Sequence, residues 1–187
     1  MNFFEEYMHL MEGISGFEEA FQSIMKYEKF PKNTILHEAG KICDDFYIVI
    51  SGIGRVYFYK EDKDITCHFA SENETMTAID SFIQRKKSKY FVEALEELEV
   101  FKISYLDLEN LLTINPEFER FVRLFMQHAY VELAERIGYL QLNTAQERYE
   151  ILLKKSPYLF QRVAAKHIAS FLGISPETLS RIRANTR

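Results

Sequence analysis

The chain has 187 residues, 47% of them apolar, which is enough for a hydrophobic core in one large domain or two small ones. Its net charge of −5 argues, taken alone, against a nucleic-acid-binding protein. No cationic-apolar signal opens the chain and no apolar run approaches the roughly 18 residues of a membrane span, so we expect a soluble, cytoplasmic protein. Cys43 and Cys67 lack metal-ligand or redox spacing, which predicts free buried thiols and neither a metal nor a cofactor.

The charge is unevenly distributed along the chain. Residues 144–187 carry eight lysines and arginines against three acids, a net +5, so the rest of the chain is strongly acidic. A basic end on an acidic body is typical of a separate nucleic-acid-binding module.

The first part of the chain is predicted to be helical over residues 2–27, in two pieces separated at Gly13 and Gly16. Residues 28–103 then contain short bursts of β-branched and aromatic residues between turn formers, which is typical of strands. The expected strands are 33–37, 46–50, 54–59, 65–70, 90–95 and 100–104, with a charged hairpin turn at 60–64. This close, regular spacing predicts an antiparallel roll or barrel rather than a sheet of βαβ units.

A short helix is expected over residues 105–114, and Pro116 opens a long one, since proline fits the first helical turn. The apolar residues of the long helix recur in steps of three and four over about six turns. One small roll cannot cover so much apolar surface, which favours a dimer seam over packing within one chain. The predicted seam residues are Phe118, Val122, Phe125, Ala129, Leu133, Ile137 and Leu140.

The C-terminal residues predict three further helices. Thr144 and Glu147 form a capping box that starts the first of them. The last two dozen residues indicate two short helices around a tight turn at Gly173, where a positive φ costs least. Ala169, Gly173 and Leu179 have the spacing of a DNA-binding helix-turn-helix.

The second helix of this pair leaves five polar residues exposed. They are Glu177, Thr178, Ser180, Arg181 and Arg183. Arginine can bond guanine bidentately, and glutamate can accept a hydrogen bond from a cytosine amino group. The alternative is an ordinary corner of two helices with a solvated outer face, but the motif spacing favours DNA binding.

The order of lead-in helix, β-roll, long helix and helix-turn-helix resembles the Crp/Fnr (cyclic-AMP receptor / fumarate-nitrate regulator) family of bacterial transcription factors. The matching stretches are 38–40, 46–52, 54–56, 92–94, 102–105, 115–116 and 168–183. The resemblance implies an α+β fold with an N-terminal antiparallel β-roll, a cyclic-nucleotide-binding-like jelly roll, over residues 1–115. It implies a dimerisation helix over 116–142 and a helix-turn-helix DNA-binding domain over 143–187.

The resemblance also implies partners and site residues. The partners would be a second copy of the chain, double-stranded DNA with half-sites roughly 34 Å apart, RNA polymerase and a small-molecule effector held in the roll. A Glu-x-x-Ser-Arg pattern in this family reads a TGA-type core, so the expected base readers are Glu177, Ser180 and Arg181. The expected contacts to the DNA backbone are Ser175, Thr178, Arg183, Lys166, Arg162 and Arg187.

Two features depart from the family pattern. Pro176 stands where some members have a basic residue, and it cannot add a contact to DNA. The chain ends four residues after Arg183, so we expect the β-wing of many members to be absent. Affinity would then rest more on cations that meet phosphates.

The roll lacks the family's phosphate cassette, which resembles Gly-Glu-x-x-Leu followed by Arg-Ser/Thr-Ala. No glycine occurs between Gly54 and Gly138, and the corresponding stretch, 76–82, has no Gly-Glu pair. We therefore expect no cyclic nucleotide bound in the usual way. Another effector could bind among aromatic and basic residues of the roll, or the roll could be filled by its own side chains. The candidate effector residues are Met76, Phe82, Lys89 and Tyr90.

The predicted function is sequence-specific transcription regulation by a homodimer. The alternative is a ligand-sensing or scaffold protein whose helix-turn-helix contacts protein, which the net negative charge favours and the basic C-terminal end does not. The sequence contains no nucleophile elbow or metal triad, so we expect no enzymatic activity.

Overall fold

The computed structural model describes residues 16–185, so the first part of the helical stretch expected over residues 2–27 lies outside the described residues. The helices are α3 (Phe17–Ile24), α4 (Ile79–Gln84), α5 (Tyr105–Ile114), α6 (Glu117–Leu142), α7 (Ala145–Lys155), α8 (Leu159–Arg162), α9 (Ala165–Leu172) and α10 (Pro176–Asn185). The strands are β1 (Lys26–Phe30), β2 (Ile35–His37), β3 (Asp45–Ser51), β4 (Gly54–Lys60), β5 (Lys63–Ala70), β6 (Thr75–Met76), β7 (Phe91–Ala94) and β8 (Leu98–Ser104).

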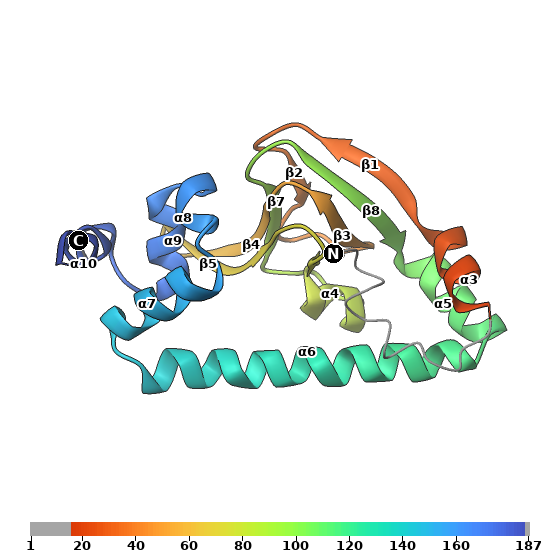
Figure 1. Cartoon of the computed structure of the whole chain (residues 1–187). Helices are drawn as coiled ribbons and strands as arrows, with labels where there is room; N and C mark the ends of the chain where they lie inside the picture. Colours follow the sequence, from red (N-terminus) through yellow and green to blue (C-terminus); the bar gives the residue numbers. More distant parts are fainter. Residues whose placement is uncertain (1–15, 186–187) are drawn as a thin grey trace.

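The strands form the predicted antiparallel roll. One sheet has the order β1-β8-β3-β6 and the other has the order β2-β7-β4-β5. The inner faces of the two sheets enclose a core that includes Tyr47, Val56, Val92 and Val100, all at most 7% exposed. The long helix α6 runs beneath the roll in Figure 1. The C-terminal helices α7 to α10 lie at the end of α6 that is opposite to α5.

The β4–β5 hairpin shows how local sequence sets a turn. Glu61 and Asp62 both have positive φ, at 50° and 61°. This is the backbone of a two-residue hairpin turn whose twist matches that of the flanking strands. The charged stretch expected to be a turn is therefore a tight hairpin, and β5 ends up as an edge strand of its sheet.

The structure differs from the sequence prediction at Lys26–Phe30, which is a strand, whereas the expected helix ended at residue 27 and no strand was expected over residues 28–30. It pairs antiparallel with β8 along its whole length, from Lys26 opposite Lys102 to Phe30 opposite Leu98. The backbone hydrogen bonds to β8 outweigh the local helical pattern. The short elements β6, α4 and α8 were likewise not predicted.

The N-terminal end of α6 packs on its own chain. Phe118 is fully buried and stacks on Phe17 with ring centroids 4.5 Å apart, and Phe121 meets the same ring edge-on at 4.5 Å. Phe125 is partly buried against Phe46. The placement of Phe118 in a dimer seam is therefore wrong, because no part of its side chain is accessible to a second copy.

Helix α7 begins with the predicted capping box. Thr144 accepts a hydrogen bond from the Glu147 amide at 3.3 Å, and the Glu147 carboxylate accepts from the Thr144 amide at 2.7 Å. The corner between α6 and α7 is held further by Arg148, which donates to the Asn143 carbonyl at 2.9 Å.

Replacing the capping residue gives a first testable effect. Thr144→Ala is expected to lower the free energy of unfolding by about 1 kcal/mol, because the Glu147 amide loses its partner and the Glu147 carboxylate loses the Thr144 hydroxyl. Urea denaturation of both proteins measures this. An unchanged midpoint would mean that water replaces the cap at no cost.

Candidate nucleic-acid interface

The helix-turn-helix forms as its spacing predicts. Gly173 ends α9 with φ of 67°, and Ser175 caps α10 by accepting from the Thr178 amide at 3.2 Å. Ala169 and Leu172 are fully buried and Leu179 is 1% exposed, so the two helices cross on small and branched apolar residues. This packing fixes α10 relative to α9.

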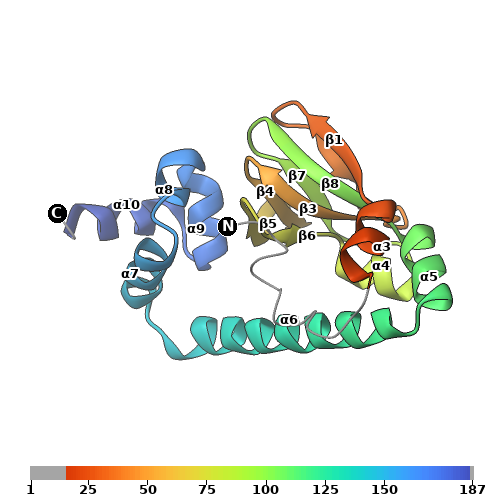
Figure 2. The same cartoon turned by 45° about the vertical axis from the view of Figure 1, so that its right-hand side comes forward.

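The outward face of α10 carries the predicted base readers. Glu177, Ser180 and Arg181 are exposed, while Leu179 and Ile182 face the core. A hydrogen bond links Arg181 to the Thr178 hydroxyl at 3.2 Å. Helix α10 lies at the end of the molecule away from the roll, so its polar face is open (Figures 1 and 2).

The residues expected to meet DNA phosphates are divided by the structure. Lys166 is exposed at the start of α9, and Ser175 is exposed at the start of α10, whereas the guanidinium of Arg183 lies 5.6 Å from the Phe160 ring. Arg187 lies outside the described residues. Arg162 points to the roll and forms ion pairs with Glu72, at 2.7 Å, and with Glu96. In this conformation Arg162 is occupied and does not extend the basic surface.

Helix α9 covers the free edge of β5. The Ser170 hydroxyl accepts from the Thr66 amide and donates to the Asp64 carbonyl, both at 2.8 Å. It thus satisfies two backbone groups that a further strand would otherwise pair. The next residue on α9, Phe171, packs on Phe69 of β5, with the two ring centroids 5.1 Å apart.

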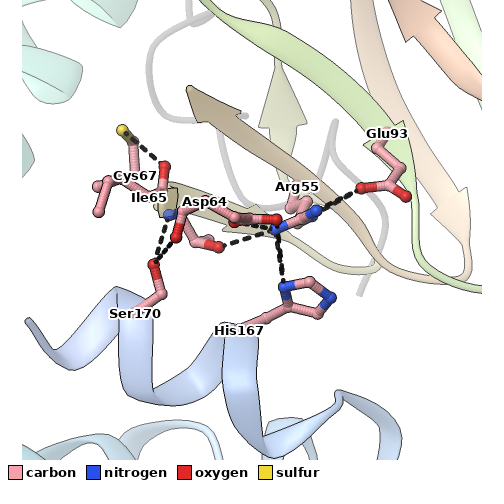
Figure 3. Close-up of polar contacts among 8 residues, drawn as sticks. Arg55, Asp64, Ile65, Cys67, Glu93, His167 and Ser170 are labelled. Atoms are coloured by element: carbon pink, nitrogen blue, oxygen red, sulfur yellow. Dashed lines mark hydrogen bonds and ion pairs between the residues drawn. The ribbon is translucent and has the colours of Figure 1, made fainter. Parts of the chain in front are cut away.

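Beside this edge, Arg55 connects the roll to α9 (Figure 3). The Arg55 side chain is 4% exposed and pairs with Asp64 at 2.6 Å and Glu93 at 2.7 Å. Its Nη1 also lies 2.7 Å from Nδ1 of His167 on α9. Because a guanidinium has no acceptor, Nδ1 of His167 must accept this bond, which places the ring proton on Nε2.

Arg55 lies in the stretch 54–56 that resembles the Crp/Fnr family, but no role for it was predicted from the sequence. The available signal was a cation inside an otherwise apolar strand. Such a charge is retained in a core only with buried partners. Nothing in the sequence showed that one partner would come from a residue 112 positions later.

His167 makes this contact sensitive to pH. Burial and the neighbouring Arg55 cation lower its pKa from 6.5 to about 4. The unfolded chain therefore binds a proton at His167 below about 6.5, and the folded chain only below about 4. The free energy of unfolding should fall as the pH is lowered through this window, by about 3 kcal/mol at most from this group.

Urea denaturation at pH 7, 6 and 5 tests this, with His167→Asn as the matched variant. Burial also lowers the pKa of His37, so the variant should keep a shallower pH dependence in the same direction. An identical dependence in both proteins would show that His167 does not contribute.

The segment that replaces the phosphate cassette is closed by its own side chains. Asp80 accepts from the Ser88 hydroxyl and from the Ser81 amide, both at 2.8 Å. Arg85 donates to the Cys43 carbonyl at 2.6 Å and lies 4.0 Å from the Tyr105 ring. The Ser81 amide and the Arg85 guanidinium thus have partners within the chain.

The structure also contains an apolar cavity of about 370 Å³ beside α6. Its lining residues are Phe21, Phe46, Ile79, Phe82, Ile83, Ile103, Tyr105, Leu108, Glu109, Leu112, Phe121, Val122, Phe125 and Met126. Of the four candidate effector residues, only Phe82 is among them. Met76 is buried in the core of the roll, and the Lys89 ammonium lies 5.2 Å from the Tyr90 ring.

Two further findings concern residues 16–185 only. Within them no cluster of three or more His, Cys, Asp or Glu residues has the arrangement of a metal site. None of their helices combines the length and apolar character needed to cross a membrane.

Comparison with known proteins agrees with this architecture. Residues 27–115 match the cyclic nucleotide-binding domain family. The cAMP-activated global transcriptional regulator CRP of Salmonella typhimurium is 23% identical, over 88% of this chain and 83% of its own. Among solved structures, the c-di-GMP responsive global regulator CLP of Xanthomonas campestris has a TM-score of 0.70 at 19% identity, covering 92% of this chain and 91% of its own. FixK2 of Bradyrhizobium japonicum has a TM-score of 0.70 at 17% identity, covering 87% and 84%.

The roll, the long helix and the helix-turn-helix thus have the architecture of CRP-type regulators. Over most of its length the chain is similar to Crp/Fnr-type regulators, in sequence and in fold.

Proposed function

We propose that this protein is a homodimeric regulator that acts in the cytoplasm and binds palindromic DNA with TGA-type half-sites. The observation that carries the proposal is the exposed Glu177, Ser180 and Arg181 face on a well-packed helix-turn-helix. These side chains offer the donors and the acceptor that base edges in the major groove require. RNA polymerase, as in the family, would be the partner of the DNA-bound protein.

The exposed side of α6 supports a dimer. Met126, Tyr130, Leu133, Ile137 and Leu140 are between 37% and 73% exposed. Their spacing of four, three, four and three is that of a coiled-coil seam. The seam we propose therefore keeps Leu133, Ile137 and Leu140 of the predicted set, and Phe118 is excluded by burial. Val122, Phe125 and Ala129 are partly covered within the chain and would lie beside the seam.

We also propose that the roll does not hold a cyclic nucleotide in the family's usual manner. The Asp80 carboxylate, bonded to Ser81 and Ser88, would repel a phosphate in the cassette segment. Arg85, which could neutralise one, already contacts Cys43 and Tyr105. Isothermal titration with cyclic AMP tests this, and saturable binding with micromolar affinity would contradict it.

Salt dependence distinguishes DNA binding from the alternative of protein contact through α10. Anisotropy of a labelled duplex should show log K falling linearly with log salt, with a slope of about −0.9 for each phosphate contacted. Lys166→Ala should make that slope less steep by about 1 per protomer. Binding that is absent at low salt, or insensitive to salt, would support the protein-contact alternative instead.

A further inference from the structure

The contact between α9 and the roll has the composition of a protein core at its centre and ion pairs at its edge. Ile168 of α9 belongs to the same apolar cluster as Ile53 and Phe69 of the roll. At the edge, the Ser71 hydroxyl lies 2.9 Å from the Tyr158 hydroxyl, and Arg162 pairs with Glu72. This interface joins the part of the chain that would read DNA to the part that would sense an effector.

Arg55 is the buried residue through which three strands of the roll meet α9. It lies on β4, its carboxylate partners Asp64 and Glu93 lie on β5 and β7, and His167 is its partner on α9. The guanidinium also lies 3.9 Å from the Tyr57 ring, which limits its rotation. A cation held from several sides presents its donors in fixed directions. Its Nη1 faces the Asp64 carboxylate, the Thr66 hydroxyl and Nδ1 of His167.

The position of α9 determines the position of α10, since the two helices share a tightly packed core at Ala169, Leu172 and Leu179. Helix α6 also contacts α9 directly, because Arg136 donates to the Phe171 carbonyl and its guanidinium lies 3.8 Å from the Phe171 ring. The corner at Asn143 and Thr144 joins α6 to α7. The orientation of α10 relative to α6 therefore depends on two sets of α9 contacts, one with α6 and one with the roll.

We propose that Arg55 is a positioning residue for DNA reading: through His167 it holds α9 against the roll and thereby sets where α10 lies relative to α6. In a dimer joined along α6, this contact fixes the separation of the two α10 helices. The inference rests on the proposed function, because it assigns a residue that determines which half-site spacing the dimer accepts.

The Thr66 amide reports on this contact without any added label. Its partner is the Ser170 hydroxyl across the interface, so it exchanges with solvent when α9 leaves β5. His167→Leu removes the acceptor for Arg55 but leaves Ser170, Asp64 and Glu93 in place. His167→Asn is the matched control, because its side-chain oxygen can take the place of Nδ1. Arg55→Met is less suitable, since it leaves two carboxylates unpaired beside the core and could unfold the sheet.

Two measurements are made on each protein as the full-length chain. The first is the hydrogen exchange rate of the Thr66 amide by NMR, with the Val100 amide in the roll core as internal reference. The second is the affinity for DNA duplexes whose two half-sites have been chosen by selecting bound duplexes from a random pool. One duplex keeps the selected spacing between the half-sites, and the others have one or two base pairs inserted between them. We expect His167→Leu to raise Thr66 exchange on the order of tenfold and to reduce the discrimination between spacings by a similar factor. Its preference for half-site sequence should not change, and His167→Asn should resemble the wild type.

Each contrary result has a distinct meaning. Thr66 exchange as in the wild type would show that the Arg55–His167 contact does not hold α9. If Thr66 exchange rises in His167→Leu but the preference for one half-site spacing stays as sharp as in the wild type, the contact of α9 with the roll does not determine the position of α10. This result would also overturn the proposal. If the wild type binds no duplex at all, the proposed function fails and the positioning role fails with it. The exchange measurement then still decides whether Arg55 holds α9 on the roll.

Discussion

Leu133→Asp is expected to convert the proposed dimer into monomers. Leu133 lies in the middle of the exposed stripe on α6 and is 58% exposed in the single chain. The substitution therefore leaves the fold of one protomer intact, but it places two unpaired carboxylates in the seam of a dimer. We expect the dissociation constant of the dimer to rise by at least about a hundredfold, or roughly 3 kcal/mol. Light scattering coupled to gel filtration measures the mass directly.

Val131→Asp is the matched control for this experiment. Val131 is 54% exposed on the same helix but lies outside the stripe of four-three spacing, so this variant should stay dimeric. Phe125→Asp would be a poorer test, since Phe125 contacts Phe46 and Phe121 in its own chain and a charge there disturbs the roll. A dimeric Leu133→Asp protein, or a monomeric Val131→Asp protein, would place the seam elsewhere.

Arg181→Ala is expected to remove both affinity and sequence preference. A bidentate contact between arginine and guanine is worth about 1–3 kcal/mol, and a dimer carries two copies, so the loss should be about 2–6 kcal/mol. Arg181 is exposed and its contact within the chain is a hydrogen bond to Thr178, so the variant should fold normally. Competition binding against duplexes changed at one base pair measures both effects.

The contrast with Lys166→Ala identifies the role of Arg181. Lys166 is exposed at the start of α9, where it could meet a phosphate but no base edge. Its removal should weaken all duplexes by a similar factor and leave the ranking of sequences unchanged. If Arg181→Ala behaves in the same way, Arg181 contacts the backbone, and base reading must come from other residues of α10.

The parts of the fold that depend on local chemistry could be predicted from the sequence. The capping box at Thr144 and the turn at Gly173 are set by residues within a few positions of each other. The strand β1 could not be predicted, because it is a strand only through its pairing with β8, about seventy residues away. Nothing in the residues Lys26–Phe30 themselves indicated that partner.

The same limit applies to α6 and to Arg55. Helical spacing identified the apolar residues of α6 but not which of them the chain itself would cover, so Phe118 was assigned to the seam. The face of α9 that meets β5 was unknown, so His167 and Ser170 had no predicted role. The ion pairs of Arg162 could likewise not be predicted, because Glu72 and Glu96 come from loops whose positions only the folded roll defines.

The measurement that tests the central claim most directly is selection of bound duplexes from a random pool, with wild type and Arg181→Ala side by side. The wild type should enrich a two-fold symmetric motif with TGA-type half-sites about one helical turn apart, which spans roughly 34 Å. The variant should lose the preference at one position of each half-site and keep the spacing. A wild-type dimer that enriches no sequence over the starting pool at low salt would contradict the account of this chain as a DNA-reading regulator.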